Sequence, residues 1–195
     1  SETKTGVKKS GKNRFLLRTK ENCGFNQYWY SKRTIETMVN EVLAMGDHCA
    51  FLSTPSVYFS LPKDSKQRKN SKIFDVDTRF KKDPGFVHFD FRAPEKIPEE
   101  LCHKFDYIVI DPPFITTDVM ELYSKAAHLL MSKDAKILMS TVPENAKTLR
   151  RLMNLIPQAF RPLCPTLIYQ YDFYTNYSTF KESQLNLKNP EVDGE

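Results

Sequence analysis

The chain has 195 residues, of which 40% are hydrophobic and 12% aromatic, so it can build a globular core and is not a disordered or low-complexity protein. No stretch is apolar for the length of a membrane span and no secretory signal is visible, so no membrane partner is expected. The four scattered cysteines form no CxxC pair, which disfavours a zinc site and a disulfide framework. We therefore expect no metal and a reduced, cytoplasmic protein.

The net charge of +5 is concentrated at one end of the chain. Residues 1–20 carry seven basic side chains and one acid, so they hold a charge of +6 and the remaining residues sum to −1. We expect residues 1–20 to be a disordered basic tail, residues 21–180 to form a single domain, and residues 181–195 to be a second disordered tail. The basic tail can simply be solvated, or it can contact phosphates of a nucleic acid.

The first predicted helix follows a run of three aromatic residues. Tyr28, Trp29 and Tyr30 stand directly before Ser31, which can cap a helix that continues to about residue 45 and is closed by Gly46. The aromatic run can pin this helix to a sheet. It can also line the mouth of a site, where aromatic faces suit a sulfonium or an alkylammonium.

The first strand is predicted at residues 49–52, and a short helix is predicted directly after it. Ser53 or Thr54 can cap this helix, and Pro55 suits its first position. With Ser56, these residues would offer free N–H groups and positive potential to the carboxylate of a ligand, although the string also fits an ordinary capped helix. The lysine-rich segment 61–72 is expected to be exposed.

A second strand is predicted at residues 71–77, and it ends in carboxylates. Asp77 lies 22 residues after Pro55, close to the offset at which nucleotide-binding folds place an acid that holds both ribose hydroxyls. Asp75 would share a strand face with Asp77, and we rank Asp77 first. Solvated carboxylates, or a pair with Arg79, are the alternative.

A third strand is predicted at residues 85–91. Asp90 near its end could accept a hydrogen bond from an adenine amino group, and Phe91 would pack nearby. The alternative is an ordinary turn aspartate.

A fourth strand, residues 105–110, ends abruptly in Asp111, Pro112, Pro113 and Phe114. Because proline lacks an N–H group and has a fixed φ, the two prolines force a stiff turn at the carboxyl edge, where ligands of open α/β sheets bind. A nitrogen could donate to Asp111 and to the Pro112 carbonyl while Phe114 offers an apolar face. This layout resembles the amine-positioning motif of S-adenosylmethionine-dependent amino-methyltransferases.

In the rest of the chain, the spacing of apolar residues predicts a helix at residues 118–131, a strand at 136–140, a helix at 146–155 and a strand or hairpin at 167–177. This order fits an α/β fold with a mostly parallel sheet and helices on both faces.

Five segments together resemble one family, the eukaryotic elongation factor 1A lysine methyltransferases, formerly described as N6-adenine-specific DNA methyltransferases. They are residues 27–31, 55–58, 77–80, 111–114 and 176–177, in that order. The most discriminating is Pro-Ser-Val-Tyr at 55–58, which replaces a glycine-rich loop. The resemblance implies a Rossmann-like class I methyltransferase fold, S-adenosyl-L-methionine as cofactor and elongation factor 1A as the protein partner. The chain departs from the family at Phe114, where tyrosine is common, and in its lysine-rich N-terminal region.

The expected roles follow from the residues and the resemblance together. The expected catalytic residues are Asp111, Pro112 and Phe114. The expected lysine-binding residues are Tyr28, Trp29, Tyr30, Tyr58 and Phe114. The expected cofactor-binding residues are Ser53, Thr54, Pro55, Ser56, Asp75, Asp77, Asp90, Phe91 and Asp111.

Two other functions compete with lysine methylation. An adenine-N6 methyltransferase acting on RNA or DNA would use the same Asp111 contacts, with Phe114 stacked on a flipped base and the basic tail on the nucleic acid. A binding subunit with this fold but no activity is the third alternative, and the intact carboxylate at position 111 argues against it.

Overall fold

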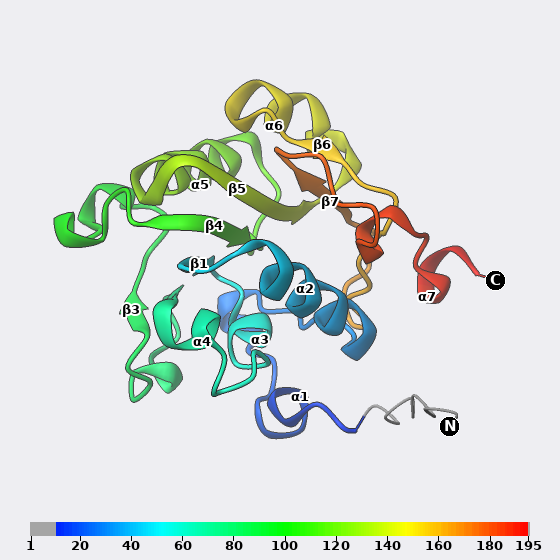
Figure 1. The fold of residues 1–195 in the computed structure, drawn as a ribbon, viewed down its shortest axis with the longest axis horizontal. Helices are drawn as coiled ribbons and strands as arrows, with labels where there is room; N and C mark the ends of the chain where they lie inside the picture. Colours follow the sequence, from blue (N-terminus) through cyan, green and yellow to red (C-terminus); the bar gives the residue numbers. More distant parts are fainter. Residues whose placement is uncertain (1–10, 195) are drawn as a thin grey trace, which may run out of the picture.

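The computed structural model describes residues 11–194, which form a seven-stranded sheet with helices on both faces (Figure 1). The strand order is β3-β2-β1-β4-β5-β7-β6, with β1 to β5 parallel and β7 antiparallel to both of its neighbours. The strands are β1 (Cys49–Leu52), β2 (Lys72–Asp75), β3 (Phe86–His88), β4 (Phe105–Ile110), β5 (Met131–Thr141), β6 (Ile156–Pro157) and β7 (Asp172–Thr175). This topology confirms the predicted Rossmann-like class I methyltransferase fold.

The helices are α1 (Arg14–Arg18), α2 (Lys32–Met45), α3 (Pro55–Tyr58), α4 (Lys66–Asn70), α5 (Thr117–Leu130), α6 (Ala146–Met153) and α7 (Pro190–Asp193). Within residues 11–194, no helix combines the length and the hydropathy that crossing a membrane requires.

The two central strands supply apolar side chains to both layers of the core. Leu52 and Ile110 pack in the layer that contains α5 and α6, whereas Phe51 and Val109 pack in the layer that contains α2 and α3. Because successive side chains of a strand point to opposite faces, a strand buried on both faces reads as a continuous apolar run. This explains why β1 and β4 were predicted with the bounds that the structure shows.

Helix α2 also begins and ends as predicted. The Ser31 side chain accepts a hydrogen bond from the Thr34 backbone N–H at 3.2 Å, and Gly46 follows the last residue of the helix. Gly46 has extended backbone angles, so its role is close packing and not a left-handed turn. A Cβ atom at this position would lie 2.6 Å from Cys49 Sγ and 3.0 Å from Tyr107 Cβ.

Several predicted strand limits need correction. The predicted strand 71–77 ends at residue 75, the strand 85–91 covers only residues 86–88, and of the segment 167–177 only residues 172–175 form a strand. The two-residue strand β6, which pairs with β7, was not predicted because it is too short to show a pattern.

Both expected tails are shorter than predicted. Phe15 in α1 is buried, its ring lies 5.0 Å from Trp29 in an edge-on contact, and it stacks on Phe59 at 5.9 Å. At the other end, Leu185 is fully buried. Single anchoring residues of this kind leave no periodic pattern in a sequence. Residues 1–10 and 195 of the expected tails lie outside the described residues.

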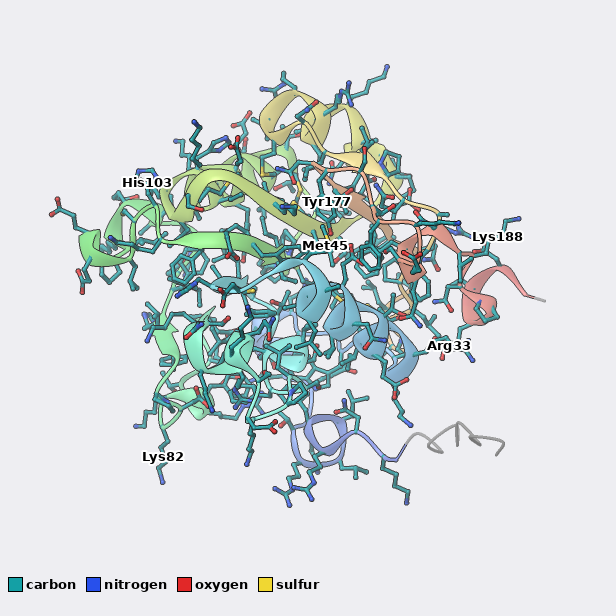
Figure 2. The ribbon with its side chains drawn as sticks, viewed as in Figure 1. Arg33, Met45, Lys82, His103, Tyr177 and Lys188 are labelled. Atoms are coloured by element: carbon teal, nitrogen blue, oxygen red, sulfur yellow. The ribbon has the colours of Figure 1, made fainter. Side chains whose placement is uncertain are left out.

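A buried hydrogen-bond network holds the C-terminal segment to α2. Both Tyr177 Oη and Ser183 Oγ donate to the Glu41 carboxylate at 2.7 Å, and the hydroxyls of Tyr107 and Tyr177 lie 2.6 Å apart. In the view of Figure 2, Tyr177 lies near the centre, whereas Lys82 and Lys188 extend from the outline of the molecule. The Asn176–Tyr177 motif is therefore structural, because Asn176 also bonds the backbone of β5 through Ile137 N–H and Ala135 C=O.

The docking of α1 can be tested by comparing two of its residues. We expect Phe15→Ala to lower the free energy of unfolding by about 3 kcal/mol, because it removes a buried aromatic ring from a packed cluster. Leu17→Ala, in the same helix but 64% exposed, should change it by less than about 0.5 kcal/mol. Urea unfolding measures both, and equal midpoints for the two variants would contradict the docked helix.

Candidate active site

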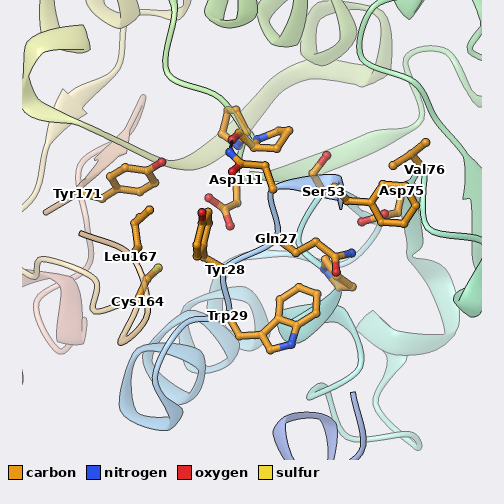
Figure 3. A pocket seen from close by; sticks show the side chains of 15 residues that line it. Gln27, Tyr28, Trp29, Ser53, Asp75, Val76, Asp111, Cys164, Leu167 and Tyr171 are labelled. Atoms are coloured by element: carbon orange, nitrogen blue, oxygen red, sulfur yellow. Dashed lines mark hydrogen bonds between the residues drawn. The ribbon is translucent and has the colours of Figure 1, made fainter. Parts of the chain in front are cut away.

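Two adjoining cavities lie at the carboxyl ends of β1, β2 and β4, where the strand order of the sheet reverses. The first, which we call the carboxylate cavity, is drawn in Figure 3. It is lined by Phe25, Asn26, Gln27, Tyr28, Trp29, Ser53, Pro55, Asp75, Val76, Asp111, Pro112, Pro113, Cys164, Leu167 and Tyr171. The second, the aromatic cavity, has a volume of about 380 Å³ and contains Phe89, Phe91, Phe114 and Tyr123.

Asp111 stands at the end of β4 and is held by a chain of two hydroxyl groups. Ser140 Oγ, from β5, donates to Asp111 Oδ1 at 3.0 Å. Because the single proton of Ser140 is used there, the Tyr30 hydroxyl donates to Ser140 Oγ, 2.5 Å away. Burial raises the pKa of Asp111 to about 7, although the hydroxyl groups of Ser140 and Tyr30 act in the opposite direction. The carboxyl group is therefore fixed in position and close to its titration point at neutral pH.

The two prolines after Asp111 have different hydrogen-bonding roles. Asn26 Nδ2 donates to the Pro113 carbonyl and so joins the N-terminal segment to this turn. The Pro112 carbonyl receives no hydrogen bond from residues 11–194. The Pro112 carbonyl is therefore free to accept a hydrogen bond from a ligand, and its predicted contact with an amine stays a prediction.

Phe114 does not line the carboxylate cavity. Its side chain is 47% exposed, it lines the aromatic cavity, and its ring lies 6.1 Å from that of Phe91. Phe91 in turn stacks on Tyr123 at 5.5 Å. The predicted contact of Phe114 with a substrate amine stays a prediction, since its present neighbours are the aromatic rings of the second cavity.

Ser53 occupies the position where a glycine would be expected. Its φ is 57°, in the left-handed region that residues other than glycine rarely adopt. Its hydroxyl lies 2.6 Å from the Tyr123 hydroxyl, and this bond helps hold the turn. Ser53 lines both cavities, so the turn after β1 borders the whole site.

Of the two acids at the end of β2, Asp77 was ranked first for ribose binding, but the structure leaves Asp75 with more free hydrogen-bonding capacity. Asp77 is buried, caps the turn at Thr78–Phe80, and accepts hydrogen bonds from Gln27 Nε2 at 2.9 Å and from Arg79 Nη2 at 2.7 Å. Hydrogen bonds of this kind lower the pKa of Asp77, while burial raises it, with a net lowering. Its carboxylate is therefore already used.

Asp75, in contrast, lines the carboxylate cavity. Its Oδ1 accepts the Asp77 backbone N–H at 2.9 Å, and burial raises the pKa of Asp75 to about 7. Asp75 is thus the acid that faces the cavity with capacity to accept further hydrogen bonds, for example from a pair of hydroxyl groups.

Asp90 and Phe91 line the aromatic cavity, and their contact with an adenine stays a prediction. Asp90 is paired with Arg92 Nη2 at 2.9 Å, and hydrogen bonds from Arg92 lower the pKa of Asp90. A cavity walled by aromatic rings and edged by a carboxylate fits a flat heterocycle with an amino group. With Asp75 beside it, the residues present fit a nucleoside.

Of the tyrosines and the tryptophan predicted to bind the substrate, two line the carboxylate cavity and two do not. Tyr28 and Trp29 line the carboxylate cavity, with Trp29 Nε1 donating to the Thr19 carbonyl at 3.0 Å. Tyr30 lies behind Asp111, as described above. Tyr58 lines neither cavity, since its hydroxyl donates to Asp83 Oδ1 at 2.6 Å and Arg68 stacks on its ring, and its assignment to the substrate is not supported.

The helix start after β1 contributes less than predicted. Pro55 lines the carboxylate cavity, but Thr54 and Ser56 are buried and line neither cavity. Thr54 makes no side-chain cap, and its hydroxyl has no hydrogen-bond partner among the described residues.

Sequence reasoning missed one wall of the site. Cys164, Leu167 and Tyr171 come from the segment between β6 and β7, and they lie together on one side of the cavity in Figure 3. No local motif marks them. Asn26 and Gln27 also border the cavity. Their place beside the aromatic run was one signal, and Gln27 also belongs to the segment 27–31 that resembles the family.

Within residues 11–194, Asp47, His48 and Asp106 have possible metal-ligating atoms within 4.8 Å of one another. They lie at the start of β1 and β4, at the sheet edge opposite Asp111. These three residues are therefore outside the candidate site. The Asp106 carboxylate also accepts hydrogen bonds from the backbone N–H groups of Asp47 and His48.

Comparison with known proteins finds methyltransferases both as a family model and as individual relatives. A family model described as "Probable N6-adenine methyltransferase" matches residues 21–179. EEF1A lysine methyltransferase 1 of Bos taurus is 29% identical over 182 residues, covering 89% of this chain and 79% of that protein. A protein-lysine N-methyltransferase of Dictyostelium discoideum is 30% identical, covering 87% of this chain and 82% of that protein.

Among solved structures, a branched-chain polyamine synthase of Thermus thermophilus shares the fold. It has a TM-score of 0.58 at 12% identity and covers 83% of this chain and 61% of that chain.

The buried carboxyl of Asp75 makes stability depend on pH. Its pKa is higher in the folded chain, about 7, than the unfolded value near 3.9, so the folded state holds the proton more tightly. The tighter proton binding by Asp75 in the folded state adds to the free energy of unfolding. This addition is complete below about pH 3.9 and is lost as the pH rises through about 7.

We therefore expect Asp75→Asn to unfold about 3 °C above the wild type at pH 8, with a smaller difference at pH 4.5. Thermal unfolding at both pH values measures this. The exposed Asp64→Asn should follow the wild type at each pH. A difference between Asp75→Asn and the wild type that does not change with pH would contradict the raised pKa.

Proposed function

Because the chain belongs to the family described as "Probable N6-adenine methyltransferase", we propose that it is an S-adenosylmethionine-dependent N-methyltransferase whose acceptor is a lysine of elongation factor 1A. Its curated relatives in Bos taurus and Dictyostelium discoideum carry protein-lysine methyltransferase names, and the former names EEF1A. The relatives thus favour a protein acceptor over the adenine that the family description names.

The observation that carries this proposal is the state of Asp111. It is a half-buried carboxyl fixed by Ser140 at the edge where the strand order reverses, and the Pro112 carbonyl follows it in the chain. An amine placed there can donate to two oxygens at once, which orients its lone pair. Tyr28 and Tyr171 line the same cavity and suit the methylenes and the cationic nitrogen of a lysine.

The cofactor would extend across both cavities. Asp75 would accept the ribose hydroxyls, and Asp90 with Phe91 would hold the adenine in the aromatic cavity. The turn at Ser53 and Pro55 would border the amino-acid portion. When bound, this cofactor supplies an electrophilic methyl group; it needs no metal.

The residues of the chain then have three tasks. Tyr28, Trp29 and Tyr171 surround the lysine side chain and exclude water, which lowers the amine pKa from its ordinary value of about 10.4. Asp111 orients the neutral amine through a hydrogen bond from nitrogen to its carboxylate. Because burial raises the pKa of Asp111 to about 7, this group can also receive the proton that the amine sheds before it passes to solvent.

The partner determines where the reaction takes place. Elongation factor 1A works in translation, so we propose the cytoplasm as the compartment.

A methyl-transfer assay tests the proposal directly. Purified elongation factor 1A and total RNA are offered side by side with labelled S-adenosylmethionine. We expect label on the protein and about a 100-fold lower kcat/KM for Asp111→Asn, because the amine loses its positioning carboxylate. Mass spectrometry then identifies the modified lysine.

The matched control is Asp118→Asn, which removes an exposed carboxylate from the following helix and should retain full activity. Label on RNA alone would identify the adenine activity instead. Cofactor binding without label on either acceptor would indicate a binding subunit.

A further inference from the structure

We propose that Ile168 and Tyr169, which we call the apolar rim, are a docking surface for the substrate protein beside its target lysine. This inference rests on the proposed function and adds the recognition surface to it. The occupant is the folded protein that carries the lysine, and the contact on that protein is an apolar side chain.

The first observation that supports the docking surface is the location of the exposed apolar side chains. Among the described residues, the large hydrophobic side chains that are exposed are Leu17, Val76, Phe114, Ile156, Ile168, Tyr169 and Leu187. Val76 and Phe114 line the cavities, and Ile168 and Tyr169 stand between Leu167 and Tyr171, which also line one. Exposed apolar surface is therefore gathered at the site, and such gathering marks an interaction surface.

The second support is the degree of exposure within the rim. Ile168 is 88% exposed and Tyr169 is 54% exposed, although the neighbouring Leu167 and Tyr171 turn into the cavity. The rim side chains thus leave more than half of their surface in water. A partner that covers them removes apolar area from water and gains about 25 cal/mol per Å².

The third support is that the segment carrying the rim is held in place. Gln170 Nε2 donates to the Pro162 carbonyl at 2.8 Å and to the Tyr171 carbonyl at 2.7 Å. Thr166 Oγ1 contacts the Glu21 carboxylate at 2.7 Å, and the Leu167 N–H donates to the Cys164 carbonyl at 3.0 Å. A docking surface that is fixed before binding loses little conformational entropy when the partner arrives.

The geometry also limits where the partner contacts the rim. Ile168 directly follows Leu167, a cavity-lining residue, and consecutive Cα atoms are about 3.8 Å apart. An extended chain advances about 3.3–3.6 Å per residue. A substrate segment whose lysine enters the cavity therefore brings residues within about three positions of the lysine onto the rim.

The chemistry of the rim favours a protein over a nucleic acid. An isoleucine and a tyrosine offer no positive charge to phosphates, which dominate the binding of nucleic acids. An isoleucine edge suits aliphatic or aromatic side chains, which are abundant in the centre of protein interfaces.

The test is steady-state methylation of elongation factor 1A by Ile168→Ser and Tyr169→Ala. We expect each to raise KM for the protein about tenfold, with kcat and the dissociation constant for S-adenosylmethionine within twofold of the wild type. The control is Leu187→Ser, which is 63% exposed and lines neither cavity, and it should leave KM unchanged.

A lysine-peptide array gives an independent readout. The wild type should prefer peptides with an apolar residue within about three positions of the lysine, and Ile168→Ser should lose that preference. The proposed apolar rim alone would be overturned if the wild type is active but Ile168→Ser shows neither a higher KM nor a changed peptide preference. Wild type that labels no protein and no peptide would overturn the proposed function and, with it, the rim.

Discussion

The site depends on a half-buried carboxylate that hydroxyl groups hold in place at the end of β4. Asp111, Ser140 and Tyr30 belong to the β4 end, to β5 and to the segment before α2, and one chain of hydrogen bonds joins them. The burial that raises the pKa of Asp111 to about 7 works against folding at neutral pH, and the two hydroxyl donors offset part of this penalty. The parallel pairing of β4 with β5 is what brings Ser140 beside the aspartate.

The turn after β1 is the second structural feature on which the site depends. A class I fold needs a backbone that turns sharply where the cofactor approaches, and glycine usually supplies the required φ. Here Ser53 adopts φ of 57°, and its hydroxyl contacts Tyr123 on α5. That residue also stacks on Phe91 in the aromatic cavity. The unusual turn is therefore tied to the wall of the aromatic cavity, so a hydrogen bond and a ring contact join the two cavities.

Local sequence signals predicted the elements and the central motif, because the causes are local. A capped amphipathic helix at 32–45, two apolar runs and the proline turn at 112–113 are each determined within a few residues. Local signals could not decide between Asp75 and Asp77, because the hydrogen bond from Gln27 that helps to occupy the Asp77 carboxylate forms only in the folded chain. Tyr58 was likewise removed from the site by Asp83, a partner 25 residues away. The wall formed by Leu167 and Tyr171 arises from the fold alone.

The electrostatics of the cavity select the kind of acceptor. Two carboxyls, the buried Asp75 and the half-buried Asp111, border the same cavity, and the charge of Asp75 adds to the effect of burial in raising the pKa of Asp111. A positive charge between them relieves that repulsion, whereas a phosphate would add to it. A cationic sulfonium and an alkylammonium both meet this condition, and the anionic backbone of a nucleic acid does not. The cavity therefore favours a lysine over a base in a phosphate chain, for the same physical reason that it keeps two acids close to their protonated state.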